Sequence, residues 1–561
     1  MGIASRLAVS RWLWLPFVSL AAGGAWLSAA SLWNPSGWPQ FFAFWQASLA
    51  PDLHLSLLIT AGQALLTTLA YAICGTTLSL CLGFIGSILI SEVGQQVYGW
   101  SVLAGLGQGL RRVLVVPRAI HEMLWGLFFI NLWGLDPLTA IAAITIPYSA
   151  IVAKVFGDIL DDTPRQSFQA ILQGGGRPFN ALLYGLLPSA SKNLLSYSFY
   201  RFECSLRSAA TLGLIGVGGL GHEIFLSLQS LRYEQVWTFI YALVILNGSI
   251  DWCSARCRHR LGCQTRIDLH LNPTASPPPG YIPPQRTPRS TVLLFSLSLG
   301  GLLMLVLWSW LYIGSDLTQL MAAQTWRNGQ QLMVGVWPLS FGLQAWPQLL
   351  GLSLQTLSMS LLAILGAGAG GIVLSFGTAA NFFLPGGLFL PQPVSWAQQG
   401  VAWLLVGVAR LFLLLCRSIP APIWALIVLF IVFPGILPGA ISLGIHNLGI
   451  LGRLMAEVNE NLDQKPLLAL QSHGAPNPSV LLYGVLPMTL PRFLAYSCYR
   501  WEVSMRETII VGLVGAGGLG RLLSEQLSSF DSVAVMGTLS CFVALSLMVD
   551  WLSHQLRQQL Q

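Results

Sequence analysis

Long apolar runs alternate with short polar connections along almost the whole chain. A helix that crosses a bilayer needs about 20 mostly apolar residues, so each run of that length predicts a transmembrane helix. The predicted spans are twelve, at residues 12–33, 64–90, 113–133, 137–156, 187–215, 233–252, 291–312, 350–376, 402–432, 434–452, 486–514 and 532–552. The first run is longer than the apolar core of an ordinary signal peptide, which favours an uncleaved span. The pattern predicts an all-α polytopic membrane protein.

Composition strengthens this interpretation and adds an orientation. Of the 561 residues, 54% are hydrophobic and 9% are charged, whereas a soluble domain carries roughly 25% charged residues. Cytosolic enzymes, disordered chains and secreted disulfide scaffolds are therefore excluded. The net charge of +7 comes from basic residues that fall mainly on one side of the spans: Arg6, Arg11, Arg111, Arg112, Arg165, Arg177, Arg256, Arg258, Arg260, Arg266, Arg286, Arg289, Lys465 and Arg557. The positive-inside rule then places both termini in the cytoplasm, and the basic excess predicts no nucleic-acid partner.

The chain contains an internal repeat. Residues 181–221 and 480–520 align without a gap at an offset of 299, and 21 of the 41 positions are identical. The same offset relates Arg118 to Arg417 upstream and Asp251 to Asp550 downstream. If Thr68 is aligned with Thr356, the second copy carries roughly eleven extra residues between its second and third spans. This repeat predicts three segments: a first half at 1–252, a Pro-rich cytoplasmic linker at 253–290 and a second half at 291–561. With six spans each, the halves are parallel, and a pseudo-twofold axis along the membrane normal should relate them.

Charged residues interrupt the fifth span of each half. They are Arg201, Glu203 and Arg207 in the first half and Arg500, Glu502 and Arg506 in the second. A charge at the bilayer centre costs at least ~2.5 kcal/mol, so these side chains need a partner or a wet cavity. In each half Glu precedes Arg by four residues, the favourable order for an ion pair that only locks the helix bundle. Counting two Arg and one Glu per half leaves one positive charge, which would suit an anionic substrate.

The third spans add two more candidates for a substrate path. Arg118 has an acidic neighbour four residues later, Glu122, which could neutralise it. Arg417 has Ala421 at the corresponding position, so Arg417 is the better candidate to face an anion.

A glycine-rich motif follows each fifth span. It comprises Gly216, Gly218, Gly219 and Gly221 in the first half and Gly515, Gly517, Gly518 and Gly520 in the second. The spacing matches a dinucleotide-binding fingerprint, but each motif follows a long apolar run and not a strand of a βαβ unit. We interpret the motif as a tight break on the periplasmic side, where small residues let helices pack closely. Backbone N–H groups that meet an anion there are the alternative.

Two other clusters of polar residues give weaker evidence for a functional site. Cys253, Cys257 and Cys263 with His259 fit no zinc spacing. Asp158, Asp161 and Asp162 lie after a predicted span, where a solvated face is the simpler interpretation. We expect no catalytic residue, no metal and no cofactor bound by this chain, because it contains neither a nucleophile triad nor a Gly-x4-Gly-Lys phosphate loop.

The loop before each fifth span contains a recognisable motif. It consists of Ala170, Gly175, Leu187 and Pro188 in the first half and Ala469, Gly474, Leu486 and Pro487 in the second. This resembles the coupling-loop motif of type I ABC-transporter permeases, Glu-Ala-Ala-x3-Gly-x9-Ile-x-Leu-Pro. The chain departs from that motif in lacking its Glu and in having Gly185 and Gly484 at the Ile position. The wider stretch LYG-x-LP…Y-x-x-YR-x-E-x-x-x-R…GL-x-G-x-GGLG is similar to the phosphonate/phosphite branch, near the methionine permeases.

The resemblance implies a function and partners. It implies a permease subunit of the bacterial inner membrane, with two permease copies fused in one chain, that moves phosphonate or a related phosphorus oxyanion. Two separate ATPase subunits would supply ATP and Mg²⁺, and a periplasmic binding protein would deliver the substrate. Alternatives are a type I permease for another small solute such as methionine, a self-contained twelve-helix secondary transporter, which also has two parallel halves, and, remotely, an integral membrane enzyme.

Overall fold

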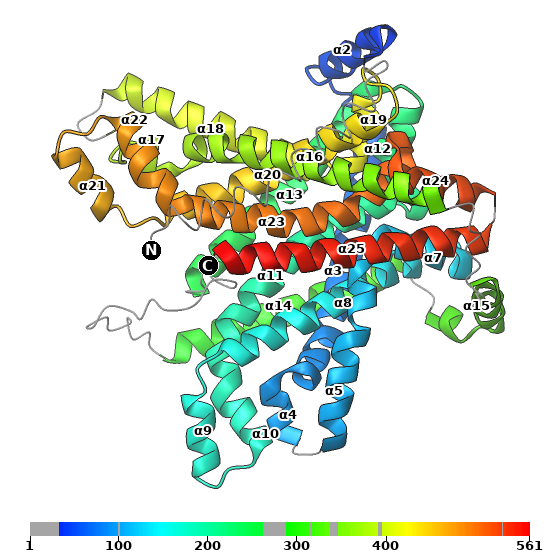
Figure 1. Cartoon of the computed structure of the whole chain (residues 1–561), viewed down its shortest axis with the longest axis horizontal. Coiled ribbons are helices and arrows are strands. Elements are labelled where there is room, and N and C mark those ends of the chain that lie inside the picture. The colour runs from blue at the N-terminus through cyan, green and yellow to red at the C-terminus, as the bar shows by residue number, and fades with distance from the viewer. Residues whose placement is uncertain are drawn as a thin grey trace. The chain divides into compact units, whose positions relative to one another are not determined.

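The computed structural model describes residues 33–98, 101–261, 288–314, 317–336, 346–390, 395–529 and 531–560. In this part of the chain the ordered structure is helical apart from two isolated β-bridges, so the predicted all-α class is confirmed (Figure 1). The chain forms two compact units. One is Asp52–Gly329, and the other combines the residues before Asp52 with those after Gly329.

The first unit is built mainly from the first repeat. Its helices are α3 (Leu55–Ile90), α4 (Glu92–Tyr98), α5 (Ser101–Val113), α6 (Val115–Ala119), α7 (Glu122–Trp133), α8 (Pro137–Asp162), α9 (Gln166–Gln173), α10 (Pro178–Asn180), the π-helical turn η2 (Ala181–Leu186), α11 (Leu187–Leu212), the π-helical turn η3 (Gly213–Val217), α12 (Leu220–Gln229), α13 (Tyr233–Leu261), α14 (Pro288–Ile313), the short 3₁₀ helix η4 (Leu317–Met321) and the start of α15 (Ala323–Val336).

The second unit repeats the same succession. Its helices are η1 (Pro35–Gly37), α2 (Trp38–Ala47), α16 (Trp346–Thr378), α17 (Ala380–Phe383), α18 (Trp396–Ser418), α19 (Ala421–Val428), α20 (Ile436–Glu460), α21 (Lys465–Ser472), α22 (Asn477–Ser479), the π-helical turn η6 (Val480–Val485), α23 (Leu486–Val511), the π-helical turn η7 (Gly512–Ala516), α24 (Gly518–Ser528) and α25 (Ser532–Leu560).

In each unit two long helices pack along each other through small residues. In the first unit α3 lies along α8, and a Cβ at Gly83 would stand 2.5 Å from Val152. In the second unit α16 lies along α20, and a Cβ at Gly439 would stand 2.1 Å from Met359. Glycine at these positions lets the backbones approach closely, which in lipid replaces the hydrophobic driving force of a soluble core.

Seven of the described helices are long and apolar enough to cross a membrane, or nine if each sharply bent helix pair is one span. Most predicted spans therefore coincide with helices. The predictions of uninterrupted spans at 113–133 and 402–432 are wrong. In the first, α6 ends at Ala119 and the chain bends by 88° before α7. In the second, α18 ends at Ser418 and Pro420 precedes the separate helix α19. The first predicted span, except its last residue Trp33, lies outside the described residues, as does most of the predicted linker. Its first residues continue α13 as far as Leu261.

The compact units do not coincide with the sequence repeats, because each contains a segment from the other repeat. Asn34, before α2, donates from Nδ2 to the Phe430 carbonyl at 3.2 Å, just after α19. Asn328, in α15, donates to the carbonyl of Leu132, in the last turn of α7, at 3.4 Å. Phe430 and Asn131, whose carbonyl also accepts from Asn328, are equivalent at the offset of 299. The two exchanged segments thus make corresponding contacts.

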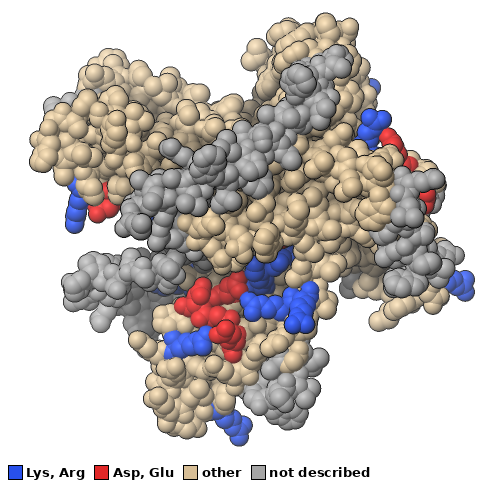
Figure 2. Space-filling model, viewed as in Figure 1, with Lys and Arg blue, Asp and Glu red and all other residues tan. Residues whose placement is uncertain are grey.

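The surface is mostly uncharged. Figure 2 shows few Lys, Arg, Asp or Glu side chains on the face in view. Helix α18 is the clearest case, since only 17% of its most apolar stretch is buried and Trp403, Leu404, Val408 and Leu411 are all exposed. Such a helix requires a lipid environment on its outer side.

Candidate functional site

A helical hairpin precedes the fifth-span helix of each unit. In the first unit α9 ends at Gln173, and Gly175 turns the chain with φ = 81° before α10. In the second unit α21 ends at Ser472, and Gly474 turns the chain with φ = 83°. Positive φ strains any residue with a Cβ, so glycine makes this turn possible. Both predicted loop glycines therefore lie where a short helix reverses into the long one.

The glycines that depart from the coupling-loop motif have a structural role. A Cβ at Gly185, in η2, would stand 3.1 Å from the backbone of Ser167 and Phe168 in α9. A Cβ at Gly484, in η6, would stand 2.7 Å from Leu467 in α21. The short helix therefore packs directly on the π-helical turn, and an isoleucine would push it away.

Each hairpin leaves an apolar face uncovered. Tyr184 and Tyr483, which are equivalent in the repeat, are 70% and 79% exposed. Leu183 and Leu482 beside them are exposed as well. Opposite these side chains, Phe168 and Leu467 anchor the short helices in the hydrophobic core. The exposed faces form two matching surfaces of a kind that a protein partner covers.

The glycine-rich motifs form a break between two helices in each unit. Gly216 and Gly515 have φ values of 95° and 105°, and they end the π-helical turns η3 and η7. In the first unit the chain bends by 53° here, and α12 returns against α11. Cβ atoms at Gly221 and Gly520 would stand 1.7 and 2.2 Å from backbone carbonyls of the preceding helix. A helix break therefore lies at each glycine-rich motif.

A threonine fixes each break. Thr68 in α3 accepts a hydrogen bond from the backbone N–H of Leu220 at 2.8 Å. Thr356 in α16 accepts the equivalent bond from Leu519 at 2.9 Å. Because Leu220 and Leu519 are equivalent, so are the two threonines. This confirms the alignment that assigns the extra residues of the second half to the connection after α16.

Acidic residues of the fifth-span helices pair with the last helix of each unit. Arg258 in α13 donates to Glu203 at 3.2 Å, and Ser254 donates to the same carboxylate at 2.6 Å. In the second unit Arg557 in α25 donates to Glu502. The sequence predicts that both arginines follow the last span of a half on its basic side, and in the structure they lie in the extended helices α13 and α25 and reach buried acids. The ion pairs therefore tie together two helices of one unit, in addition to any bond within the fifth-span helix.

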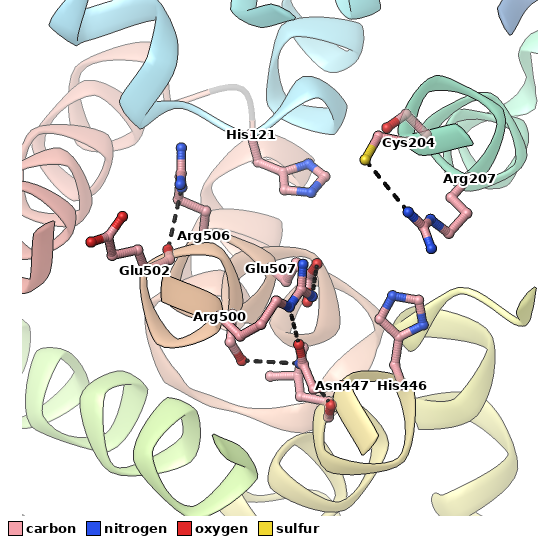
Figure 3. Close-up of polar contacts among 12 residues, drawn as sticks. His121, Cys204, Arg207, His446, Asn447, Arg500, Glu502, Arg506 and Glu507 are labelled. Atoms are coloured by element: carbon pink, nitrogen blue, oxygen red, sulfur yellow. Dashed lines mark hydrogen bonds and ion pairs between the residues drawn. The ribbon is translucent and has the colours of Figure 1, made fainter. Parts of the chain in front are cut away.

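The remaining arginines of these helices have different surroundings in the two units. The guanidinium of Arg201 lies 3.9 Å from the ring centre of Tyr148 in α8. Arg500 donates from Nε to Asn447 Oδ1 in α20 at 2.7 Å and from Nη2 to Glu507 at 3.3 Å (Figure 3). The expectation of one acid in each fifth-span helix is wrong for the second half, because α23 carries Glu507 as well as Glu502.

The other predicted path residues are distributed around these helices. Arg207 donates to Cys204 at 3.4 Å, and Arg506 donates to the backbone carbonyl of Glu502 at 3.3 Å (Figure 3). Arg118 lies in the last turn of α6, and Arg417 lies in the last turn of α18. Both residues directly precede a break in the chain. The structure thus places Arg118 and Arg417 at equivalent breaks, the first before α7 and the second before α19.

Comparison with known proteins identifies the family that this architecture represents. The family described as "Binding-protein-dependent transport system inner membrane component" matches residues 101–260 and 394–561, that is, once in each half. The chain belongs to this family. It is therefore a permease subunit, not an enzyme, and a multi-pass protein of the inner membrane. Membership implies ATPase and binding-protein partners.

Individual relatives cover different amounts of this permease. It is 25% identical over 475 residues to the "Phosphate-import permease protein PhnE" of Mycolicibacterium smegmatis, covering 84% of the chain and 80% of the relative. It is 38% identical over 155 residues to the "Phosphite transport system permease protein PtxC" of Stutzerimonas stutzeri, covering 28% and 56%. It is 34% identical over 118 residues to the "Putative cryptic phosphonate transport system permease protein PhnE2" of Escherichia coli K12, covering 21% and 97%. The resemblance stated from the motifs is confirmed.

Several residues of the permease were missed by sequence reasoning. Arg258, Arg557 and Glu507 each hold a charge of the fifth-span helix. The sequence contains a signal for each of these three residues. Arg258 and Arg557 are related by the repeat offset, as are the acids they pair with, and Glu507 follows Arg506 directly in the sequence.

Proposed function

We propose that this permease moves phosphonate or a related phosphorus oxyanion across the inner membrane, driven by two separate ATPase subunits that bind and hydrolyse ATP with Mg²⁺. A periplasmic binding protein would supply the anion. The observation that carries the proposal is the pair of matching hairpins, α9–η2 and α21–η6, each with an exposed apolar face beside a buried anchor. One chain with two such faces suits two ATPase subunits.

The substrate class is supported by the relatives and by the arginines of the third and fifth spans. The relatives are named for phosphate, phosphite and phosphonate, which share tetrahedral or near-tetrahedral oxyanion geometry. Arginine offers a planar fork of donors suited to such oxygens. We propose that the path includes Arg118, Arg201, Arg207, Arg417, Arg500 and Arg506, with Glu203 and Glu502 as counter-charges. The glycine-rich breaks would close its periplasmic side.

The proposal includes a topology. Twelve spans in two parallel groups of six would be related by a pseudo-twofold axis, with both termini in the cytoplasm. The repeat offset of 299, the duplicated breaks and the position of basic residues in the sequence support this arrangement. Labelling of single cysteines placed near either terminus, in intact spheroplasts and in inverted vesicles, tests the orientation. Labelling from the periplasm would contradict it.

Reconstituted transport tests the function directly. The permease, its ATPase and its binding protein are placed in proteoliposomes, and uptake of radiolabelled methylphosphonate, phosphite, phosphate and methionine is measured with and without ATP. ATP-dependent uptake of at least one phosphorus oxyanion is the expected result. Uptake of methionine alone would replace the proposed substrate, and uptake driven by an ion gradient without the ATPase would support a secondary transporter.

A further inference from the structure

Two largely buried polar clusters occupy equivalent positions in the two units. The first cluster consists of His121, Glu122, Tyr148, Arg201 and Ser208. The second cluster consists of His446, Asn447, Arg500 and Glu507. At the offset of 299, Arg201 corresponds to Arg500 and Tyr148 to Asn447. The first cluster lies inside the first unit, with residues at the start of α7 and in α8 and α11. The second lies inside the second unit, in α20 and α23.

The carboxylate comes from a different helix in each cluster. In the first cluster it is Glu122 at the start of α7, which accepts a hydrogen bond from Ser208 of α11. In the second cluster the position of Glu122 is Ala421, and the position of Ser208 is Glu507. Each half thus has one carboxylate at this place, supplied by the third span in one half and by the fifth span in the other.

The histidine shows a second exchange of the same kind. His121 precedes α7, and its counterpart in the second half is Pro420. His446 lies in α20, and its counterpart in the first half is Pro147. His446 Nδ1 lies 3.0 Å from the Ile419 carbonyl at the break before α19. Although the carboxylate and the histidine come from different positions in the two halves, each half has one Arg, one His and one carboxylate beside the third-span break. Buried ionisable groups in a membrane are expensive, so a retained inventory indicates a function.

We propose that the second cluster is a transit site for the phosphorus oxyanion, in which Glu507 is the counter-ion of Arg500 that the anion displaces. This inference rests on the proposed function. Asn447 holds Nε of Arg500 at 2.7 Å and so fixes the plane of the guanidinium. Glu507 Oε1 accepts a hydrogen bond from Nη2 of the same group at 3.3 Å. An anion that takes the place of this carboxylate keeps a charge-assisted hydrogen bond and gains a fixed donor fork.

The counter-ion also compensates the buried charge of Arg500 when no substrate is bound. Arg500 is 6% exposed, and an uncompensated charge on so buried a side chain would be unfavourable. Glu507 neutralises it while the site is empty. Because the carboxylate must move aside for each anion, it weakens binding and speeds release. A purely structural ion pair would have neither effect on the anion.

The test compares Glu507→Gln with the wild-type permease–ATPase complex in detergent and in proteoliposomes. Glutamine keeps the size of the side chain and removes its charge. Thermal shift with methylphosphonate, phosphate and sulfate as probes should give half-maximal stabilisation at about tenfold lower methylphosphonate concentration, since hydrogen bonds to charged groups are among the stronger ones. Uptake per inserted molecule should fall, because release is slower. Sulfate should bind less tightly than methylphosphonate.

A transplant from the first half provides a second variant. Glu507→Ser removes the acid and should impair uptake, whereas Ala421→Glu together with Glu507→Ser recreates the first-half arrangement and should restore it. Glu525→Gln, at the exposed ion pair with Arg521, is the matched control and should change neither binding nor uptake.

The outcomes separate this inference from the proposed function. If wild-type complexes transport a phosphorus oxyanion but Glu507→Gln only lowers the melting temperature, with unchanged anion affinity, Glu507 is structural and the inference is overturned. If the double variant fails to restore uptake although it is inserted and stable, the equivalence of the two clusters is overturned. If wild-type complexes transport no phosphorus oxyanion, the proposed function itself fails.

Discussion

At the scale of single residues, the buried ion pairs between the fifth-span and last helices stand out because they occur twice. Glu203 and Glu502 are 4% and 9% exposed, and each accepts from an arginine 55 positions later. A buried charge that loses its partner is left uncompensated, which costs about 3–5 kcal/mol. These pairs therefore stabilise the packing of α11 on α13 and of α23 on α25.

Arg258→Met is expected to lower the melting temperature of the purified permease, because Glu203 is left buried without this cation. Glu203→Gln together with Arg258→Met should recover part of the loss, since neither charge then remains. Thermal unfolding in detergent measures both. Arg521→Met, at an exposed pair worth about 0–1 kcal/mol, is the control. Equal melting temperatures for Arg258→Met and Arg521→Met would contradict the role of the buried pair.

The expected outcome at Arg417 concerns transport and not stability. Arg417 ends α18 at the break of the third span, where we propose that it faces the anion. Arg417→Met should abolish uptake while the permease still inserts and binds its ATPase. Arg417→Lys should retain partial activity, because the charge remains but the planar fork is lost. Uptake per inserted molecule is the measurement, and normal uptake by Arg417→Met would place the anion path elsewhere.

At the scale of elements, the hairpins determine how movement of a partner could reach the membrane. Each short helix is anchored by one buried side chain, Phe168 or Leu467, and packs on a π-helical turn that continues directly into the fifth-span helix. The absence of a side chain at Gly185 and Gly484 makes this packing close. We therefore expect a displacement of α9 or α21 to be transmitted to α11 or α23.

Gly474→Asp should leave membrane insertion intact but uncouple ATP hydrolysis from uptake, because a Cβ is strained at φ = 83°. Gly185→Ile, which introduces the motif's usual residue, should have the same effect by displacing α9 from the backbone contact at 3.1 Å. ATPase rate and uptake are measured on the same proteoliposomes. A substitution at the exposed Ser472, in the preceding helix, to Ala serves as the control. An unchanged ratio of uptake to hydrolysis in both glycine variants would show that hairpin geometry does not control coupling.

At the scale of the whole molecule, the exchanged segments make each compact unit depend on both repeats. Helix α14 follows the linker but packs on α3, and Tyr312 reaches the Gln63 carbonyl at 3.4 Å. Trp45 of α2 lies 6.5 Å, between ring centres, from Trp424 of α19. These contacts do not require the two repeats to be joined by a continuous linker.

Cleavage at a protease site inserted in residues 262–287 should therefore leave the two fragments associated in detergent. Co-purification through a tag on one fragment measures this. As a comparison, a chain that lacks residues 33–47 should release its fragments more readily. Separation of the fragments immediately after cleavage would contradict the exchange.

One permease chain is expected in each transporter. The two hairpins should recruit two ATPase subunits to a single chain, without dimerisation of the permease. Native mass spectrometry of the purified complex decides this, and a complex with two permease chains would refute it.

The sequence by itself determined the class, the repeat and the breaks, because these depend on local properties. Apolar runs of membrane length predict helices, and positive φ at Gly216 and Gly515 follows from a motif that only glycine satisfies. The break before α19 could also have been foreseen, since Pro420 interrupts the apolar run at 402–432. Such features are set by a few neighbouring residues.

Only the tertiary structure decided which charges meet. Glu203 has an arginine four residues away, yet Arg258, from a helix 55 positions later, donates to it. Asn447 and Glu507 together hold Arg500, although nothing in the spacing of α20 and α23 specifies that contact. The exchange of α2 and α14 between repeats is equally invisible in sequence, because an apolar helix can satisfy its own backbone against any neighbour. Pairing between distant helices depends on how small residues such as Gly83 and Gly439 let them approach, and that is a property of the packed fold.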